Sequence, residues 1–257
     1  MHSPLLWSTR PSHQNTLWQQ QLSTLGETVA LPLLEIVPIS SDEAQQAVKS
    51  LVLDLDQFEH VLFVSQNAVA HAFDWFERYW PQMPAGIRLY AVGSKTAEAV
   101  RSYDAEVIEC GEAMNSEALL ALPSLQQVTH QKVLICRGQG GRPTLAEVLE
   151  QRGAHVSYCE LYQRALPNEA ANQCATLPHD RRHIIPLFSG ETLQNLILAL
   201  PSTMNKHETT LIVPAQRVAT MAHEAGFNNV TVAKNASQDA MLAATRQCLN
   251  HSHKDYR

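Results

Sequence analysis

Residues 132–164, KVLICRGQGGRPTLAEVLEQRGAHVSYCELYQR, contain two strands, a glycine turn and a helix in one continuous unit. The run KVLIC is short, apolar and partly β-branched, which predicts a strand, and the glycines after it mark a turn. Between residues 144 and 152 apolar residues recur at three- and four-residue spacing, which predicts a helix. A second strand begins at His155. This order of elements is typical of a parallel sheet covered by helices.

The same unit occurs 127 residues earlier, so the sequence contains an internal repeat. The matching positions are apolar residues, one arginine and one glycine: Leu6 and Val133, Arg10 and Arg137, Trp18 and Leu145, Leu22 and Leu149, Gly26 and Gly153, and Val29 and Val156. Shifts of 124 and 121 residues match further pairs: Ser65 with Ser189, Val92 with Val213, and Ser116 with Ser237. The chain is therefore predicted to contain two similar halves.

Short apolar runs alternate with helical periodicity along the whole chain, which predicts an α/β fold with largely parallel sheets. The predicted strands cover residues 5–8, 29–37, 61–65, 87–93, 106–110, 132–138, 155–162, 184–189, 210–214 and 230–233. The predicted helices cover residues 14–25, 66–80, 94–103, 116–122, 144–152, 191–200, 215–225 and 237–249. At about 150 residues per domain, a chain of 257 residues is long enough for two domains.

The composition is that of a globular protein, with 45% hydrophobic and 17% charged residues. The net charge of −6 argues against a surface for nucleic acid or anionic membranes, although a local basic pocket remains compatible with it. The N-terminal residues do not resemble a signal peptide, and no apolar run reaches the roughly 18 residues of a spanning helix. We therefore expect a cytoplasmic protein.

Cysteine and histidine are the residues that could indicate disulfides or metal. The five cysteines form no Cys-x-x-Cys pair, and their odd number leaves at least one unpaired, so we expect reduced thiols. The pairs His179/His183 and His251/His253 lie in polar segments and are interpreted as surface histidines. No metal site is predicted.

The residues that follow the predicted strands carry the candidate chemistry. In parallel α/β sheets, ligands bind at the carboxyl ends of the strands, where helix N-termini and arginines can hold carboxylates or phosphates. Nine such positions are candidate ligand-binding residues: Arg10, Ser65, Asn67, Thr96, Arg137, Gly138, Arg142, Ser189 and Arg217. We expect them to face one another across a cleft between two domains and to bind a polyanion.

Other functions have less support in the sequence. The segment RGQGGR resembles a dinucleotide-binding turn, but Thr144 stands where the third glycine belongs. No Gly-x-Ser-x-Gly motif and no convincing carboxylate pair point to a hydrolase. Tyr162 closes the strand from His155, and alternation places it on one face with Tyr158 and Glu160. From the pattern alone, Tyr162 is interpreted as a packed strand tyrosine.

Six segments in order make the chain resemble the uroporphyrinogen-III synthase (HemD) family from about residue 4 to residue 246. The segments are 6-LWSTRP, 62-LFVSQNAV, 90-YAVGSKTAEAV, 133-VLICRGQGGRPTLAEVLEQRGAHVSYCELYQR, 187-LFSGETLQNL and 235-NASQDAML. The resemblance implies two flavodoxin-like or HemD-like domains joined by a two-stranded antiparallel ladder. One domain would contain residues 1–35 and 165–257, the other residues 38–160, with ladder linkers near 33–38 and 158–164.

The resemblance also implies the reaction. The family cyclises hydroxymethylbilane, a linear tetrapyrrole with eight carboxylates, to uroporphyrinogen III with loss of water and inversion of ring D. Tyr162 matches the family tyrosine that is favoured as the proton donor to the leaving hydroxyl, and phenols are protonated at neutral pH. Thr96, Ser65 and Ser189 match family residues that line the substrate site. No metal or organic cofactor is implied.

The chain departs from some relatives at Ala215, Gln216 and Arg217, where they carry paired hydroxyl residues, so we assign Arg217 to a substrate carboxylate. We expect a monomer. Because the bilane is unstable, transient coupling with hydroxymethylbilane synthase is a further expectation. A non-catalytic two-domain protein that binds a small polyanion is the alternative. A nucleotide-dependent transferase ranks last, because the phosphate fingerprint and acidic metal ligands are missing.

Overall fold

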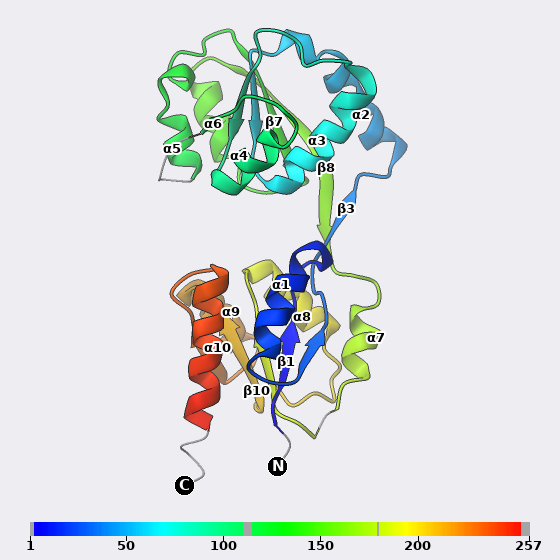
Figure 1. The fold of residues 1–257 in the computed structure, drawn as a ribbon, viewed down its shortest axis with the longest axis vertical. Coiled ribbons are helices and arrows are strands. Elements are labelled where there is room, and N and C mark those ends of the chain that lie inside the picture. Colours follow the sequence, from blue (N-terminus) through cyan, green and yellow to red (C-terminus); the bar gives the residue numbers. More distant parts are fainter. Residues whose placement is uncertain (1–2, 110–114, 179, 253–257) are drawn as a thin grey trace. The chain divides into compact units, whose positions relative to one another are not determined.

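The computed structural model describes residues 3–109, 115–178 and 180–252 (Figure 1). The chain divides into two compact units, which we call unit 1 (residues 1–35 and 165–257) and unit 2 (residues 36–164). The chain passes from one unit to the other twice, at Glu35–Ile36 and at Arg164–Ala165. Unit 1 is therefore discontinuous in sequence.

Unit 1 contains one parallel sheet between two layers of helices. Its strands are β1 (Leu5–Ser8), β2 (Thr28–Ala30), β9 (His183–Pro186), β10 (Thr209–Val213) and β11 (Asn229–Val232), in the order β11-β10-β9-β1-β2. Its helices are α1 (Ser12–Ser23), α7 (Ala170–Ala175), α8 (Gly190–Ala199), α9 (Gln216–Glu224) and α10 (Gln238–Ser252). Successive strand residues pack on opposite faces, since Trp7 and Ile185 belong to one core cluster and Leu6 and Ile184 to another.

Unit 2 contains a six-stranded sheet. Its strands are β3 (Glu35–Pro38), β4 (His60–Phe63), β5 (Arg88–Ala91), β6 (Ile108–Glu109), β7 (Lys132–Gly138) and β8 (His155–Ala165), in the order β3-β8-β7-β4-β5-β6. Its helices are α2 (Asp42–Leu53), α3 (Gln66–Tyr79), α4 (Ser94–Arg101), α5 (Ser116–Leu120) and α6 (Thr144–Gln151), with 3₁₀ turns at Leu55–Gln57 and Pro123–Leu125. Strand β3 neighbours β8, and just beyond it the Ile39 N–H donates to the Leu161 carbonyl at 3.2 Å.

The two sheets share one arrangement, as the internal repeat predicts. In unit 1 the strands taken in sequence order lie across the sheet as 2-1-3-4-5, which is the flavodoxin-like order. In unit 2 the sequence begins with β4, β5 and β6 and continues with β7 and β8, yet β8-β7-β4-β5-β6 follows the same spatial pattern. Strands β1 and β7 correspond, as do β9 and β4. The predicted α/β fold with parallel sheets is confirmed.

Several predicted elements differ in extent. The strand predicted over 29–37 is two strands, β2 and β3, and the interruption contains Pro32, which has no N–H for a ladder. The strand predicted over 106–110 is described only at Ile108–Glu109. Helices α2 and α7 are not among the predicted helices. The interpretation of His183 as a surface histidine is wrong: it is buried as the first residue of β9, where its Nδ1 accepts the Trp7 Nε1–H at 3.0 Å. Cys110, His179 and His253 lie outside the described residues.

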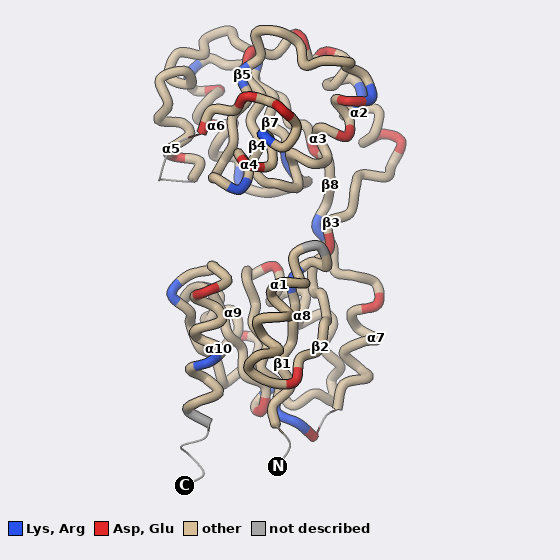
Figure 2. The backbone as a smooth tube through the Cα atoms, viewed as in Figure 1, with Lys and Arg blue, Asp and Glu red and all other residues tan. Residues whose placement is uncertain are grey.

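Four cysteines, Cys136, Cys159, Cys174 and Cys248, are free thiols, as predicted. Acidic and basic residues are scattered along both units (Figure 2). None of the helices in the described part of the chain is long and apolar enough to cross a membrane.

Candidate functional site

The centre of the sheet in unit 2 is the place where a ligand crevice is expected. Strands β4 and β7 are neighbours, but the helices that follow them cover opposite faces. Residues of α3, such as Phe73, pack with Phe63, whereas residues of α6, such as Leu149, pack with Leu62. The chains leaving the two strands therefore diverge, which opens a crevice at their carboxyl ends.

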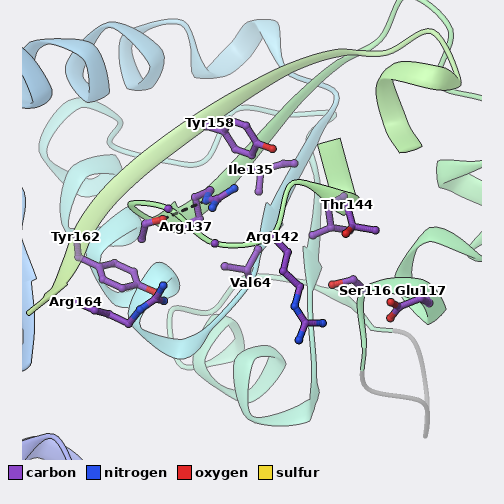
Figure 3. A pocket seen from close by; sticks show the side chains of 14 residues that line it. Val64, Ser116, Glu117, Ile135, Arg137, Arg142, Thr144, Tyr158, Tyr162 and Arg164 are labelled. Atoms are coloured by element: carbon purple, nitrogen blue, oxygen red, sulfur yellow. Dashed lines mark hydrogen bonds between the residues drawn. The ribbon is translucent and has the colours of Figure 1, made fainter. Parts of the chain in front are cut away.

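A pocket of about 140 Å³ lies at this point (Figure 3). Its lining comes from the ends of β4, β7 and β8, the loop after β7 and the start of α5 and α6: Val64, Ser116, Glu117, Ile135, Arg137, Gly138, Gly140, Gly141, Arg142, Thr144, Leu145, Tyr158, Tyr162 and Arg164. In the close-up, Tyr162 and Arg164 lie on one side, and Arg142 extends toward the side of Ser116 and Glu117. Four predicted site residues, Tyr162, Arg137, Gly138 and Arg142, are thus brought together.

The backbone places the Tyr162 ring through an irregularity in the pairing of β7 and β8. Arg137 pairs with Glu160, but Gly138 pairs with Tyr162, so Leu161 is an extra residue in β8. Leu161 and Tyr162 are consequently both buried, with 1% and 2% of their surface exposed. The prediction that Tyr162 continues the face of Tyr158 and Glu160 by strict alternation is wrong for this reason.

Contacts with α3 and β7 hold the Tyr162 side chain at the pocket. Its hydroxyl lies 2.9 Å from Ser65 Oγ, and its ring centroid lies 5.5 Å from that of His71 on α3. Its carbonyl accepts the Gln139 N–H at 2.7 Å. A Cβ on Gly138 would lie 2.5 Å from Tyr162 Cε2, so only glycine leaves room for the ring. The role of Gly138 is therefore steric, since its lack of a side chain leaves room for the Tyr162 ring.

Arg137 is a buried cation at the base of the pocket, with 7% of its surface exposed. Its guanidinium carbon lies 4.6 Å from the centroid of the Tyr158 ring, and its Nε–H donates to the Gly138 carbonyl at 3.1 Å. The Glu160 carboxylate is 3.8 Å from the same Nε. A Cβ on Gly141 would lie 2.7 Å from Nη2, so the loop closes over the guanidinium.

The loop after β7 owes its shape to two glycines with left-handed backbone angles, Gly140 at φ +69° and Gly141 at φ +100°. It carries the exposed Arg142 to the rim of the pocket. Arg137, Arg142 and Arg164 give the lining three cations, against the single carboxylate of Glu117. Such a lining suits an anionic ligand.

Three predicted residues of unit 2, Ser65, Asn67 and Thr96, lie outside this lining. Ser65 is the N-cap of α3 and contacts the Tyr162 hydroxyl. Asn67 is in the first turn of α3, and Thr96 is buried in the first turn of α4, after β5. The starts of these two helices are joined by the Gln66 side-chain amide, which donates to the Lys95 carbonyl at 3.2 Å. Asn67 and Thr96 thus follow strands that neighbour one another, and their predicted contacts with substrate stay predictions.

The other predicted residues belong to unit 1. Arg10 follows β1, stacks over Phe188 with its guanidinium carbon 4.7 Å from the ring centroid, and donates to the Gln14 side chain at 2.7 Å. Burial lowers the pKa of Arg10 from its usual value. Ser189 caps α8 by accepting the Thr192 N–H. Arg217, in the first turn of α9, extends over the start of α8, since a Cβ on Gly190 would lie 3.5 Å from its Nη1.

Sequence reasoning does not select Arg164, Ser116, Glu117 or Thr144 as site residues. The position of Arg164 near the end of β8, two residues after Tyr162, is a signal by which the strand-end argument could have found it. Ser116 and Glu117 reach the pocket from α5, which follows the edge strand β6 and gives no comparable signal. Within residues 3–109, 115–178 and 180–252, no group of three or more His, Cys, Asp or Glu side chains could hold a metal ion.

The fold and the pocket define a duplicated, flavodoxin-like α/β protein with a cationic pocket beside a buried tyrosine. A family model described as uroporphyrinogen-III synthase HemD matches residues 18–243. The uroporphyrinogen-III synthases of Salmonella typhimurium and Escherichia coli are 34% and 33% identical to the chain, over 92% of its length and 97% of theirs. The chain belongs to the uroporphyrinogen-III synthase family.

Two solved structures share the fold. A mutant uroporphyrinogen III synthase from Thermus thermophilus aligns with a TM-score of 0.61 at 15% identity, covering 97% of this chain and 100% of that one. Uroporphyrinogen-III synthetase from Helicobacter pylori aligns with a TM-score of 0.63 at 19% identity, covering 96% of this chain and 100% of that one. At these identities the likeness concerns the fold alone.

Proposed function

We propose that this enzyme cyclises hydroxymethylbilane to uroporphyrinogen III, with loss of water and inversion of ring D, in tetrapyrrole biosynthesis. The family membership and the near-complete coverage of the bacterial relatives support this reaction. The observation that carries the proposal for the site is the buried Tyr162, which lines a pocket together with three arginines.

Tyr162 acts as the general acid. Its phenol gives a proton to the terminal hydroxyl of the bilane while the carbon–oxygen bond breaks, so the hydroxyl leaves as water and an azafulvene cation remains. The substituted carbon of ring D then attacks that cation to form a spirocyclic pyrrolenine, which fragments and recloses with ring D inverted. General acids of this kind accelerate reactions by about 10²–10⁴-fold. The rest of the task is orientation of the bilane.

The pocket holds one part of the substrate. Its volume of about 140 Å³ is below the roughly 300–1,000 Å³ of pockets that enclose a whole small ligand. Because Tyr162 serves the hydroxymethyl end of the bilane, that end enters the pocket. Arg137, Arg142 and Arg164 bind the carboxylates of this end, since guanidinium groups pair with carboxylates through two parallel hydrogen bonds. Arg10, Ser189, Arg217, Asn67 and Thr96 are assigned to other parts of the substrate.

The protein works in the cytoplasm as a monomer and receives its unstable substrate from hydroxymethylbilane synthase, by diffusion or transient contact. Two buried cysteines are neighbours in the sheet of unit 2. Cys136 and Cys159 are opposite one another in β7 and β8, yet both are free thiols. Burial raises the pKa of the Cys136 thiol well above its usual value, which keeps it in the unreactive form.

The reaction is tested by isomer analysis. Hydroxymethylbilane is generated in place by its synthase, the protein is added, and the oxidised products are separated by chromatography into type I and type III uroporphyrins. Type III as the main product is expected, because the free bilane closes to type I without inversion. Type I alone, from protein with the circular dichroism of a folded α/β chain, would leave a polyanion-binding protein without catalysis.

A further inference from the structure

The Ser65 hydroxyl has two partners at the start of α3. Its oxygen accepts the Ala68 N–H at 3.1 Å, which caps the helix, and the same oxygen lies 2.9 Å from the Tyr162 hydroxyl. A serine hydroxyl has one proton to donate and two lone pairs to accept with. Since the cap uses a lone pair, the Ser65 proton is available to the Tyr162 oxygen.

The corresponding serine of unit 1 shows what this position does without a tyrosine. Ser189 begins α8 with the same extended backbone as Ser65, at φ −158° and ψ 165° against φ −164° and ψ 163°. Its oxygen accepts the Thr192 N–H at 3.1 Å, and it also lies 2.9 Å from the Thr192 hydroxyl. Ser189 is therefore satisfied within its own helix turn.

Unit 2 lacks that local partner. The 124-residue shift places Ala68 where unit 1 has Thr192, so the first turn of α3 offers Ser65 a backbone N–H but no side-chain hydroxyl at this position. The hydroxyl of Ser65 instead meets Tyr162, which arrives from β8 through the extra residue Leu161. The contact is thus specific to the unit that carries the pocket.

We propose that Ser65 is a positioning residue that donates its proton to the Tyr162 oxygen and so directs the phenol proton of Tyr162 into the pocket. After the phenol proton has passed to the leaving hydroxyl, the same Ser65 O–H stabilises the phenolate by a charge-assisted hydrogen bond. The N-terminus of α3, with its free N–H groups, adds a favourable potential at that oxygen. This inference rests on the proposed role of Tyr162 as the general acid.

Three substitutions of Ser65 separate donation from helix capping. Ser65→Ala removes both, Ser65→Thr keeps both, and Ser65→Asp keeps the cap but has no proton to donate at neutral pH. The matched control is Ser41→Ala, which removes the N-cap of α2, where Ser41 Oγ accepts the Ala44 N–H at 3.3 Å. Each cap loss is expected to lower Tm by about 2–4 °C.

The readout is kcat and KM for type III formation. Ser65→Ala is expected to lower kcat by about 10- to 100-fold, the effect of one hydrogen bond to a charged group, with little change in KM. The kcat of Ser65→Asp falls at least as far, because the charge of the new carboxylate opposes the phenolate. Ser65→Thr, which keeps the hydroxyl, recovers most of the kcat that Ser65→Ala loses, and Ser41→Ala keeps the kcat of the unchanged protein.

Three results would overturn the inference. Equal kcat in Ser65→Ala and Ser41→Ala would show that the hydroxyl matters only as a cap, and wild-type kcat in Ser65→Asp would show that donation is not needed. A rise in KM at constant kcat would make Ser65 a substrate ligand instead. All three leave the proposed reaction intact, because isomer analysis tests that reaction separately. Full turnover in Tyr162→Phe would instead remove the general-acid role on which the inference rests.

Discussion

The carboxyl ends of β1 and β7 occupy the same place in the two units but lead into different segments. In unit 1 residues 9–11 connect β1 directly to α1, whereas in unit 2 residues 139–143 form a longer loop with two left-handed glycines before α6. The described pocket lies at the second of these places. The shared sheet therefore supplies a crevice, and the loop and the extra residue in β8 turn it into a site.

The arginines at these two places differ in a similar way. Arg10 and Arg137 match in the repeat, and each guanidinium lies over an aromatic ring, Phe188 or Tyr158. Arg10 is half-buried and donates to side chains of its surroundings, whereas Arg137 is buried and held by the Gly138 carbonyl and the loop. Unit 2 thus holds Arg137 in a fixed position against the Tyr158 ring, as a preorganised anion site requires.

Among the substitutions that compare the surroundings of the site, Gly138→Ala should have the largest effect, because the new methyl group would lie 2.5 Å from the Tyr162 ring. The ring must move, and a displacement of about 1 Å in a catalytic group can cost about 100-fold in kcat. Overpacking should also lower stability by about 1–3 kcal/mol. Steady-state kinetics and urea unfolding measure the two effects.

Gly86→Ala is the matched control for that variant. Gly86 has φ +89° and nothing within 4 Å of an added Cβ, so the backbone strain of about 1–2 kcal/mol should lower stability without touching the site. If both glycine variants lost activity in proportion to stability alone, the steric account of Gly138 would be wrong.

Arg137→Gln should raise KM by about tenfold or more, which corresponds to about 1.4 kcal/mol of lost binding, with a smaller change in kcat. Arg10→Gln should raise KM less, because Arg137 lines the described pocket beside Tyr162 and Arg10 does not. Kinetics of the two variants under identical salt compare the units directly. A larger KM effect at Arg10 would move the main carboxylate site to unit 1.

His60 lies at the amino end of β4, opposite to the strand ends that form the pocket, and its substitution should give the smallest effect. It begins β4 as His183 begins β9, is fully buried, and contacts Tyr90 Oη at 3.1 Å and Gln131 Oε1 at 2.7 Å. Burial lowers the pKa of His60 from its usual 6.5. As the pH falls below about 6.5, the unfolded chain therefore binds a proton that the folded chain does not.

As the pH is lowered from 6.5 to the lowered pKa of His60, this residue should therefore decrease the free energy of unfolding by at most about 1.4 kcal/mol per pH unit. Activity should be untouched by this group. Urea unfolding at about pH 7.5 and about pH 5.5 should show a smaller pH difference in His60→Gln than in the unchanged protein. An identical difference in both proteins would remove His60 as a source of acid sensitivity.

The sequence predicts the parallel sheets, the repeat and two of the three pocket arginines, Arg137 and Arg142, because these depend on local periodicity and on strand ends. It does not predict the contact between Ser65 and Tyr162, which lie far apart in the chain and meet only because Leu161 is an extra residue in β8. A bulge in a parallel pair has no signal in the alternation of apolar residues, so alternation places Tyr162 on the wrong face.

The role of Gly138 is a second feature that the sequence does not predict. The sequence marks this residue as a turn glycine that could approach an anion, but its backbone is not left-handed, and its role follows from the ring packed against it. A steric requirement between two strands becomes visible only when both are placed. Arg164, by contrast, is open to the strand-end argument that identifies Arg137.

The most direct test is the rate of type III formation by Tyr162→Phe beside the unchanged protein, with hydroxymethylbilane generated in place and folding checked by circular dichroism. Phenylalanine keeps the packed ring and removes only the hydroxyl that contacts Ser65. The account predicts a fall in kcat of about 100-fold or more, so that spontaneous type I product dominates. Type III formation at nearly the unchanged rate would contradict it.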